Sequence, residues 1–327
     1  MPERASDIAK YHGDLHMVRK EISKVVIGQE TVVETLLKAL MVNGHVLVEG
    51  VPGVAKTLIL KALALTTGCS FQRIQFTIDL LPSDITGVSV YDKVKGFYIL
   101  KGPIFSNFVL ADEINRASPK TQAALLEAMQ EKQVTIARQT FPIQQPFFVM
   151  ATQNPIENMG VYELPEAQLD RFLFKAIITY PSTREEEDII DQNTDVRSLE
   201  SYRIKPVLSP QKILELQART RQIFLSDNLK KYIVRLVDAT RHPQKYDIQL
   251  GRYVEFGASP RASVSIASAS RAEALLRGCT YVTDRHIRNV IHDILRHRII
   301  LSYEGLATKV TTEEIIDEIL SKAEVIS

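Results

Sequence analysis

Residues 50–57 carry side chains suited to binding a phosphate group. Their sequence, GVPGVAKT, matches the phosphate-binding pattern GxxxxGK[ST] except at Ala55, which replaces the last glycine. Backbone N–H groups of such a loop point at phosphate oxygens, and the helix that follows adds positive potential. Lys56 would reach the β- and γ-phosphates, and the Thr57 hydroxyl would bind Mg²⁺. A plain strand–turn–helix with a surface lysine is the alternative, but the apolar strand before the motif favours a nucleotide site.

An acidic pair follows a second apolar run. Residues 108–111 read FVLA and are followed by Asp112 and Glu113. Carboxylates rarely end a buried strand unless they face a cation. Asp112 would hold Mg²⁺ through water, and Glu113 would polarise the attacking water. A solvent-exposed acid pair is the alternative, and it is less favoured downstream of a phosphate loop.

Three further polar residues could act on a bound phosphate. Asn154 follows the apolar run 147–152 and could orient a water, although an Asn before a proline also commonly starts a turn. Arg171 lies near a helix end, where it could reach the phosphate of a neighbouring subunit. Arg261 lies in the first turn of a helix, where a cation opposes the helix dipole and suggests an anionic partner. A solvated side chain is the alternative for Arg261.

The elements that must position these residues are short apolar runs alternating with helical patterns. This alternation predicts an α/β fold, with a parallel sheet covered by helices on both faces. The expected strands are residues 45–49, 71–76, 108–111, 147–152 and 176–180, and the expected helices are 14–41 (interrupted at Gly28), 55–67, 119–131 and 165–172.

Two long connections interrupt this pattern. Residues 77–107 look irregular because prolines and glycines punctuate them. Residues 132–146 alternate like a β-hairpin, with a turn near residues 138–140. Connections of this length in a compact domain are usually functional.

The pattern changes after Tyr180. We expect the α/β domain to span residues 1–183, a linker residues 184–206, and a second domain residues 207–327. Helical patterns dominate the second domain, which predicts an all-helical unit; they cover residues 209–223, 227–241, 260–278, 283–298 and 311–325.

The composition of the chain argues against some classes of function. The 327 residues include 40 basic and 39 acidic side chains, so a net charge of +1 provides no bulk attraction to nucleic acid or an anionic membrane. The basic residues Arg285, Arg288, Arg296 and Arg298 are expected on a solvated or subunit-contact face. Two separate cysteines, a charged amino terminus and no long apolar run favour a cytoplasmic protein.

Taken together, the motifs resemble the MoxR family of AAA+ ATPases over about residues 20–300. The segments that carry the resemblance are IGQ (27–29), GVPGVAKT (50–57), LLPSDITG (80–87), LADEINRASPKTQAALLEAMQE (110–131), ATQNP (151–155), LPEAQLDRF (164–172) and GASPRA (257–262). Members of this family also commonly have an alanine at the position of Ala55.

The resemblance implies a P-loop AAA+ αβα core, a C-terminal helical lid and a hexameric ring with ATP at the subunit interfaces. It implies that Asp112 and Glu113 form the Walker B motif, Asn154 is sensor 1, Arg171 is the arginine finger and Arg261 is sensor 2. The implied nucleotide contacts are Ile27, Gly28, Val51, Pro52, Gly53, Val54, Ala55, Lys56, Thr57, Leu58 and Asp112. Residues 77–107 resemble the helix-2 insert and residues 132–146 the pre-sensor-1 hairpin, both facing a pore or a partner.

The function implied is a chaperone-like, Mg²⁺-dependent ATPase that remodels or activates a partner complex. Family members often act with a partner bearing a von Willebrand factor A domain and help mature complexes that include metal-dependent enzymes. A nucleic-acid-associated motor or regulator is the alternative, which salt-sensitive DNA binding that stimulates the ATPase would favour. A non-hydrolysing scaffold is less consistent with Glu113 and Arg171.

Overall fold

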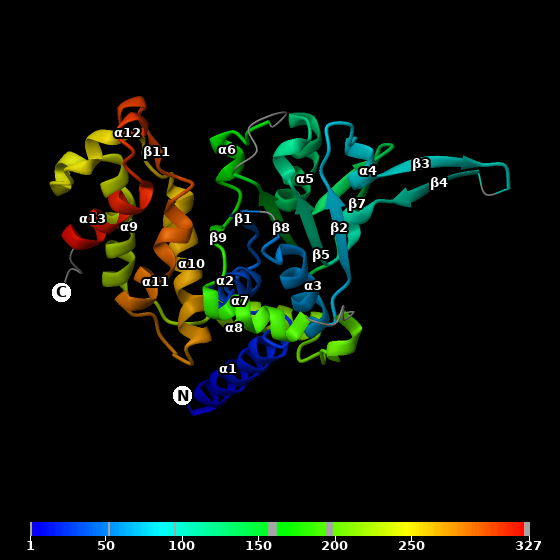
Figure 1. The fold of residues 1–327 in the computed structure, drawn as a ribbon, viewed down its shortest axis with the longest axis horizontal. Coiled ribbons are helices and arrows are strands. Elements are labelled where there is room, and N and C mark those ends of the chain that lie inside the picture. Colours follow the sequence, from blue (N-terminus) through cyan, green and yellow to red (C-terminus); the bar gives the residue numbers. More distant parts are fainter. Residues whose placement is uncertain (1, 52, 95, 156–161, 194–198, 324–327) are drawn as a thin grey trace.

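The computed structural model describes residues 2–51, 53–94, 96–155, 162–193 and 199–323. Its centre is a five-stranded sheet with the spatial order β2–β5–β8–β1–β9, in which neighbouring strands run parallel (Figure 1). The strands are β1 (Val46–Gly50), β2 (Phe71–Gln75), β5 (Phe108–Asp112), β8 (Phe148–Gln153) and β9 (Phe174–Ile178). The predicted parallel sheet is therefore confirmed.

The central strands β1, β5 and β8 are buried on both faces of the sheet, and successive side chains of each strand point to opposite faces. On β5, Phe108 and Leu110 join the hydrophobic cluster on one face, whereas Val109 and Ala111 join the cluster on the other. The helices of the first face are α1 (Pro2–Ile22), α2 (Glu30–Met41) and α3 (Lys56–Thr67). Helix α5 (Pro119–Glu131) covers the second face, and the short α6 (Glu166–Leu169) precedes β9. The expected break at Gly28 separates α1 from α2.

The insertion over residues 77–107 is more regular than expected. It contains α4 (Pro82–Thr86), followed by an antiparallel hairpin of β3 (Gly87–Asp92) and β4 (Gly96–Lys101) that projects away from the body (Figure 1). The hairpin is apolar on both faces, so its sequence lacks the alternation that marks a half-buried strand. Tyr91 and Phe97 lie opposite each other and are 63% and 78% exposed.

The second insertion forms the expected hairpin, from β6 (Gln133–Ile136) and β7 (Gln139–Pro142). Its turn falls at Ala137 and Arg138, which both have positive φ. Val134 and Ile136 are buried in the second hydrophobic cluster, so the apolar side of this hairpin packs against its own domain. That the hairpin faces a pore or a partner stays a prediction.

Helices dominate the C-terminal part of the chain. They are α7 (Thr183–Asn193), α8 (Pro210–Arg221), α9 (Asp227–Arg241), α10 (Pro260–Leu276), α11 (Asp284–Leu295), α12 (Tyr303–Ala307) and α13 (Thr312–Lys322). Helix α7 occupies the first half of the expected linker. The lid is helical as predicted, with the addition of a short antiparallel pair formed by β10 (Val254–Phe256) and β11 (Ile300–Leu301). No helix within the described ranges is both long and apolar enough to cross a membrane.

The two parts of the chain share one hydrophobic core. The cluster that covers the first face of the sheet continues through α2 into α8, α10 and α11. A buried ion pair crosses the same boundary, between Lys38 on α2 and Glu273 on α10, at 3.6 Å. Burial alone would raise the pKa of Glu273, but Lys38, Asn289 and Arg277 outweigh burial and lower it.

Candidate functional site

The carboxyl ends of the parallel strands bring the predicted phosphate loop and both acids to one edge of the sheet. The loop follows Gly50 at the end of β1, Asp112 ends β5, and Asn154 follows β8. The register aligns Gln75 of β2 with Asp112, and Glu49 of β1 with Gln153. In open α/β sheets this edge is where ligands bind.

The predicted phosphate loop contains two residues with positive φ. Gly53 and Ala55 have φ values of 84° and 58°, and Ala55 caps the amino end of α3. The left-handed conformation costs a residue other than glycine about 1–2 kcal/mol, which explains why a glycine is usual at the position of Ala55. Lys56 donates from Nζ to the carbonyl of Gly50 at 2.6 Å, and Thr57 lies in the first turn of α3.

The remaining predicted contacts of this loop follow the same path. Val51, Val54 and Leu58 lie between β1 and the second turn of α3, whereas Pro52 lies outside the described residues. The Ile27–Gly28 segment reaches the same edge, because the neighbouring Gln29 donates to the carbonyl of Thr179, just past the end of β9, at 3.3 Å.

Asp112 is held by two neighbouring strands. Its Oδ1 accepts the hydroxyl of Thr152 on β8 at 2.7 Å. Its Oδ2 accepts Nε and Nη2 of Arg73 on β2, at 3.0 and 2.6 Å. The carboxylate thus has a fixed orientation at the end of the central strands.

Glu113 is oriented by its backbone and its side chain. It adopts a left-handed conformation with φ of 57°, and its N–H donates to the hydroxyl of Thr152 at 2.8 Å. Its Oε2 accepts Nε2 of Gln75 at 2.8 Å and lies 3.1 Å from Nε of Arg116. Strained residues of this kind cluster at functional sites.

The donor set fits a nucleoside triphosphate with Mg²⁺. The twelve-residue helix α3 directs its first N–H groups and Lys56 towards the loop, a combination that suits phosphate oxygens. The hydroxyl of Thr57 and the carboxylate of Asp112 are oxygen ligands of the kind that Mg²⁺ takes directly or through water. Arg73 now holds Oδ2 of Asp112, and its side chain is 48% exposed and can move aside.

Sequence reasoning missed three residues of this site. Thr152, Arg73 and Gln75 contact the acidic pair, but their contacts depend on the strand order β2–β5–β8, which is not the order along the chain. A weak signal was present, because Arg73 and Gln75 are long polar side chains that share one face of β2, on either side of the buried Ile74.

The two other predicted arginines lie at the opposite edge of the sheet. Arg171 precedes β9 at its amino end, and Arg261 in the first turn of α10 lies 3.6 Å from Asp170. The length of β1 separates this edge from the phosphate loop by about 15 Å. A cavity of about 390 Å³ contains both arginines, together with His45 at the amino end of β1. The structure therefore brings Arg171 and Arg261 together and keeps both apart from the chain's own phosphate loop.

Two arginines of the basic stretch, Arg296 and Arg298, are not solvated as expected. The side chain of Arg296 is 12% exposed and pairs with Asp293 and Glu313. Arg298 is buried beneath this edge, with a side chain only 2% exposed, and pairs with Asp170 at 2.7 Å. It joins the lid to the segment that carries Arg171.

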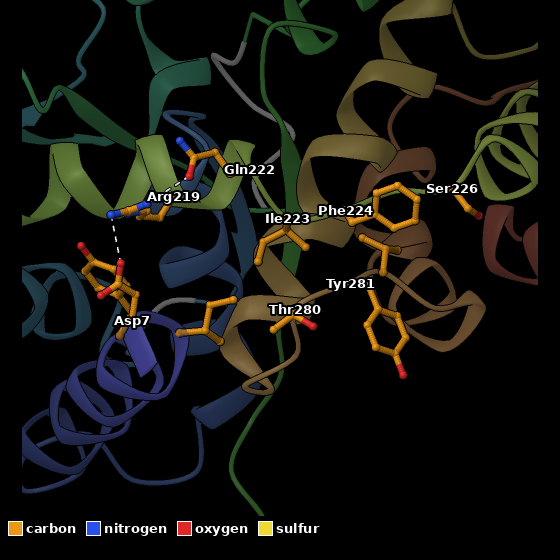
Figure 2. A pocket seen from close by; sticks show the side chains of 11 residues that line it. Asp7, Arg219, Gln222, Ile223, Phe224, Ser226, Thr280 and Tyr281 are labelled. Atoms are coloured by element: carbon orange, nitrogen blue, oxygen red, sulfur yellow. Dashed lines mark hydrogen bonds and ion pairs between the residues drawn. The ribbon is translucent and has the colours of Figure 1, made fainter. Parts of the chain in front are cut away.

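Another cavity, of about 750 Å³, lies between α1 and the lid (Figure 2). Its walls are mainly apolar, and its one ion pair joins Asp7 to Arg219 at 2.9 Å. Phe224 and Tyr281 form one wall, and both are exposed. These walls contain no phosphate loop and no acidic pair, so the chemistry belongs to the sheet edge rather than to this cavity.

Comparisons with known proteins agree with this geometry. Residues 45–174 match the model of the ATPase family associated with various cellular activities (AAA), and residues 251–319 match an AAA lid domain. Chaperone MoxR1 of Mycobacterium tuberculosis is 47% identical over 92% of this chain and 79% of its own length. Protein MoxR of Paracoccus denitrificans is 30% identical over 91% of each chain. A crystal structure of a candidate ATPase from Cytophaga hutchinsonii superposes with a TM-score of 0.93 at 43% identity, covering 100% of this chain and 98% of that one.

Proposed function

The chain belongs to the MoxR family of AAA ATPases, and we propose that it is a Mg²⁺-dependent, ring-forming ATPase that remodels a partner protein complex. The name chaperone given to its relative from M. tuberculosis supports the remodelling role. We propose the cytoplasm as its compartment, where the free thiols of Cys69 and Cys279 would stay reduced.

The observation that carries this proposal is the division of the predicted site between two edges of one sheet. The phosphate loop, Asp112, Glu113 and Asn154 lie at the carboxyl ends of the strands, and Arg171 lies at the amino ends. One subunit then supplies the nucleotide pocket and the next subunit supplies the arginine. A head-to-tail arrangement of this kind repeats around a closed ring.

Within one subunit, each residue has a defined task. Lys56 and the N–H groups of α3 would bind the phosphates, while Thr57 and Asp112 would hold Mg²⁺, which supplies charge neutralisation at the phosphates. Glu113 would accept a proton from the attacking water, and Asn154 would orient that water. The hydroxyl of Thr152 donates to Asp112 and accepts the N–H of Glu113, which fixes the positions of the two acids relative to each other.

Across the interface, Arg171 would stabilise negative charge on the neighbour's phosphates. Arg261 shares its edge and its cavity, so we propose that it also acts on the neighbouring subunit rather than on its own nucleotide. Both guanidinium groups would then sense whether the neighbour holds ATP.

We propose that the β3–β4 hairpin contacts the partner. Its exposed apolar side chains include Tyr91, Val94, Phe97 and Leu100. An exposed apolar surface of this kind marks an interaction site. On family grounds we propose a partner with a von Willebrand factor A domain and clients that include metal-dependent enzyme complexes.

Mixing two inactive variants tests the proposal. Lys56→Ala lacks a phosphate-binding cation, and Arg171→Ala lacks the arginine but keeps its own nucleotide site. In mixed rings some interfaces combine an intact loop with an intact arginine, so ATP turnover should return. Turnover should also rise more than linearly with protein concentration. If mixed rings form and stay inactive, Arg171 does not act in trans, and Arg116 is the next candidate.

A further inference from the structure

The segment that carries Arg171 is held by the lid of the same chain. From Arg298, Nε donates to Oδ1 of Asp170 at 2.7 Å, Nη2 donates to the carbonyl of Phe172 at 2.7 Å, and Nη1 donates to the carbonyl of Leu173 at 3.2 Å. The adjacent His297 places Nε2 3.1 Å from the same carbonyl of Phe172. The backbone on the carboxyl side of Arg171 is therefore fixed by two consecutive lid residues.

The lid also engages the second oxygen of Asp170. Its Oδ2 accepts the hydroxyl of Ser259 at 3.1 Å and lies 3.6 Å from Nη1 of Arg261. Within the described ranges, the guanidinium of Arg171 makes no hydrogen bond or ion pair. The carboxylate that could neutralise Arg171 from the adjacent position is thus occupied by lid side chains, which leaves Arg171 available to another anion.

The buried position requires an arginine. A buried charge is tolerated only where its partners satisfy it, and Arg298 spreads its donors over one carboxylate and several carbonyls. The planar fork of a guanidinium reaches these acceptors together, whereas an ammonium group is a single point of charge on a flexible stem.

We infer that Arg298 is a positioning residue for Arg171, which sets the orientation of that arginine towards the neighbouring subunit and keeps Asp170 from neutralising it. This inference rests on the proposed role of Arg171. If Arg298 has this role, the lid rather than the αβα core sets the orientation of Arg171.

Arg298→Lys tests the inference, because it keeps the charge and removes the fork. We expect kcat for ATP to fall at least about 10-fold while affinity for a fluorescent ATP analogue stays within about 2-fold. The matched control is Arg296→Lys. Arg296 also joins the lid to β9, by donating to the carbonyl of Lys175 at 2.6 Å, but it forms no hydrogen bond or ion pair with the described residues 170–173. Its kcat should change less than about 3-fold.

Mixed rings separate positioning from a general structural role. Arg298→Lys mixed with Lys56→Ala should regain turnover, because the Lys56→Ala subunits supply a correctly held Arg171. Arg298→Lys mixed with Arg171→Ala should not. Where Arg298→Lys does not fold, Arg298→Gln, which keeps one amide donor without a buried cation, takes its place in the same mixtures.

Three results would overturn the inference. The first is an equal loss of kcat in Arg296→Lys. The second is a loss of ATP affinity as large as the loss of kcat. The third is absence of rescue by Lys56→Ala while Arg171→Ala is rescued by the same partner. If Arg171→Ala is not rescued either, the proposed role of Arg171 fails and the inference fails with it.

Discussion

Arg73 binds the carboxylate of Asp112 with two donors, Nε at 3.0 Å and Nη2 at 2.6 Å, both directed at Oδ2. The pair joins the edge strand β2 to the central strand β5. The positive charge of Arg73 therefore lies next to the carboxylate that would also hold the proposed Mg²⁺.

Arg73→Gln should lower the Mg²⁺ concentration needed for half-maximal ATP turnover, by about 3–10-fold. The substitution removes a cation that repels Mg²⁺ and frees Oδ2 of Asp112; one charge interaction near a protein surface is worth about 1 kcal/mol or more. A Mg²⁺ titration at fixed ATP measures the effect. Arg285→Gln, an exposed arginine on α11, is the charge-matched control. An unchanged Mg²⁺ requirement would show that Arg73 does not compete for Asp112.

Glu113→Gln should bind ATP with Mg²⁺ normally and turn it over about 10²–10⁴-fold more slowly. The amide keeps the shape and the hydrogen bond to Gln75 but cannot accept a proton from water. Nucleotide binding and steady-state hydrolysis are measured on the same preparation. Glu127→Gln, on the exposed side of α5, is the control. Hydrolysis at the normal rate would mean that another base acts and that Glu113 is structural.

Replacing both Tyr91 and Phe97 by serine should abolish the ATPase stimulation caused by an unfolded protein such as reduced casein. The ring centroids lie 5.1 Å apart and both rings are largely exposed, so basal turnover and thermal stability should stay unchanged. Tyr303→Ser removes an aromatic ring that is 88% exposed on the lid and should retain stimulation. Full stimulation of the double variant would exclude the hairpin as the contact surface.

Acidification should destabilise the protein through His45. Burial, with a smaller effect of Lys132, lowers the pKa of His45 to about 4 from 6.5. Its Nδ1 accepts the N–H of Val149, and its Nε2 lies 3.3 Å from the carbonyl of Met129, so the neutral ring suits the fold. Between these two pH values the unfolded chain binds a proton that the folded chain does not.

The contribution of His45 to the free energy of unfolding should therefore be fully retained above pH 6.5 and fall by up to about 3 kcal/mol as the pH drops to 4. Urea unfolding at several pH values measures this slope. His45→Gln should reduce the slope and leave the part that comes from His297, whose pKa burial also lowers, whereas His16→Gln, on the exposed side of α1, should not change it. An equal slope in wild type and His45→Gln would assign the effect to other groups.

Contiguous motifs made much of the site predictable from the sequence. The loop around Lys56 is a contiguous motif with a characteristic spacing, and it directly follows an apolar run. The pair Asp112–Glu113 also directly follows an apolar run. The core sheet was also predictable, because its central strands β1, β5 and β8 are buried on both faces and appear as apolar runs. These features depend on neighbours along the chain.

Contacts between distant segments were not predictable in the same way. Thr152 reaches Asp112 because β8 lies next to β5, and Arg298 appeared solvated because it follows other basic residues. The hairpin of residues 87–101 was missed because apolar residues on both of its faces erase the alternation. In each case the information lies in tertiary packing rather than in local pattern.

The single hydrophobic core that joins the sheet to the lid limits how the lid can move. A hinge that swings two bodies apart would expose the apolar contacts between α2 and the helices α8 and α10 and would unpair Lys38 from Glu273. Small sliding steps of packed helices preserve such contacts. Nucleotide-driven motion in this protein should then be a shear of a few ångströms along α2, and heat should melt the lid and the sheet in one cooperative transition.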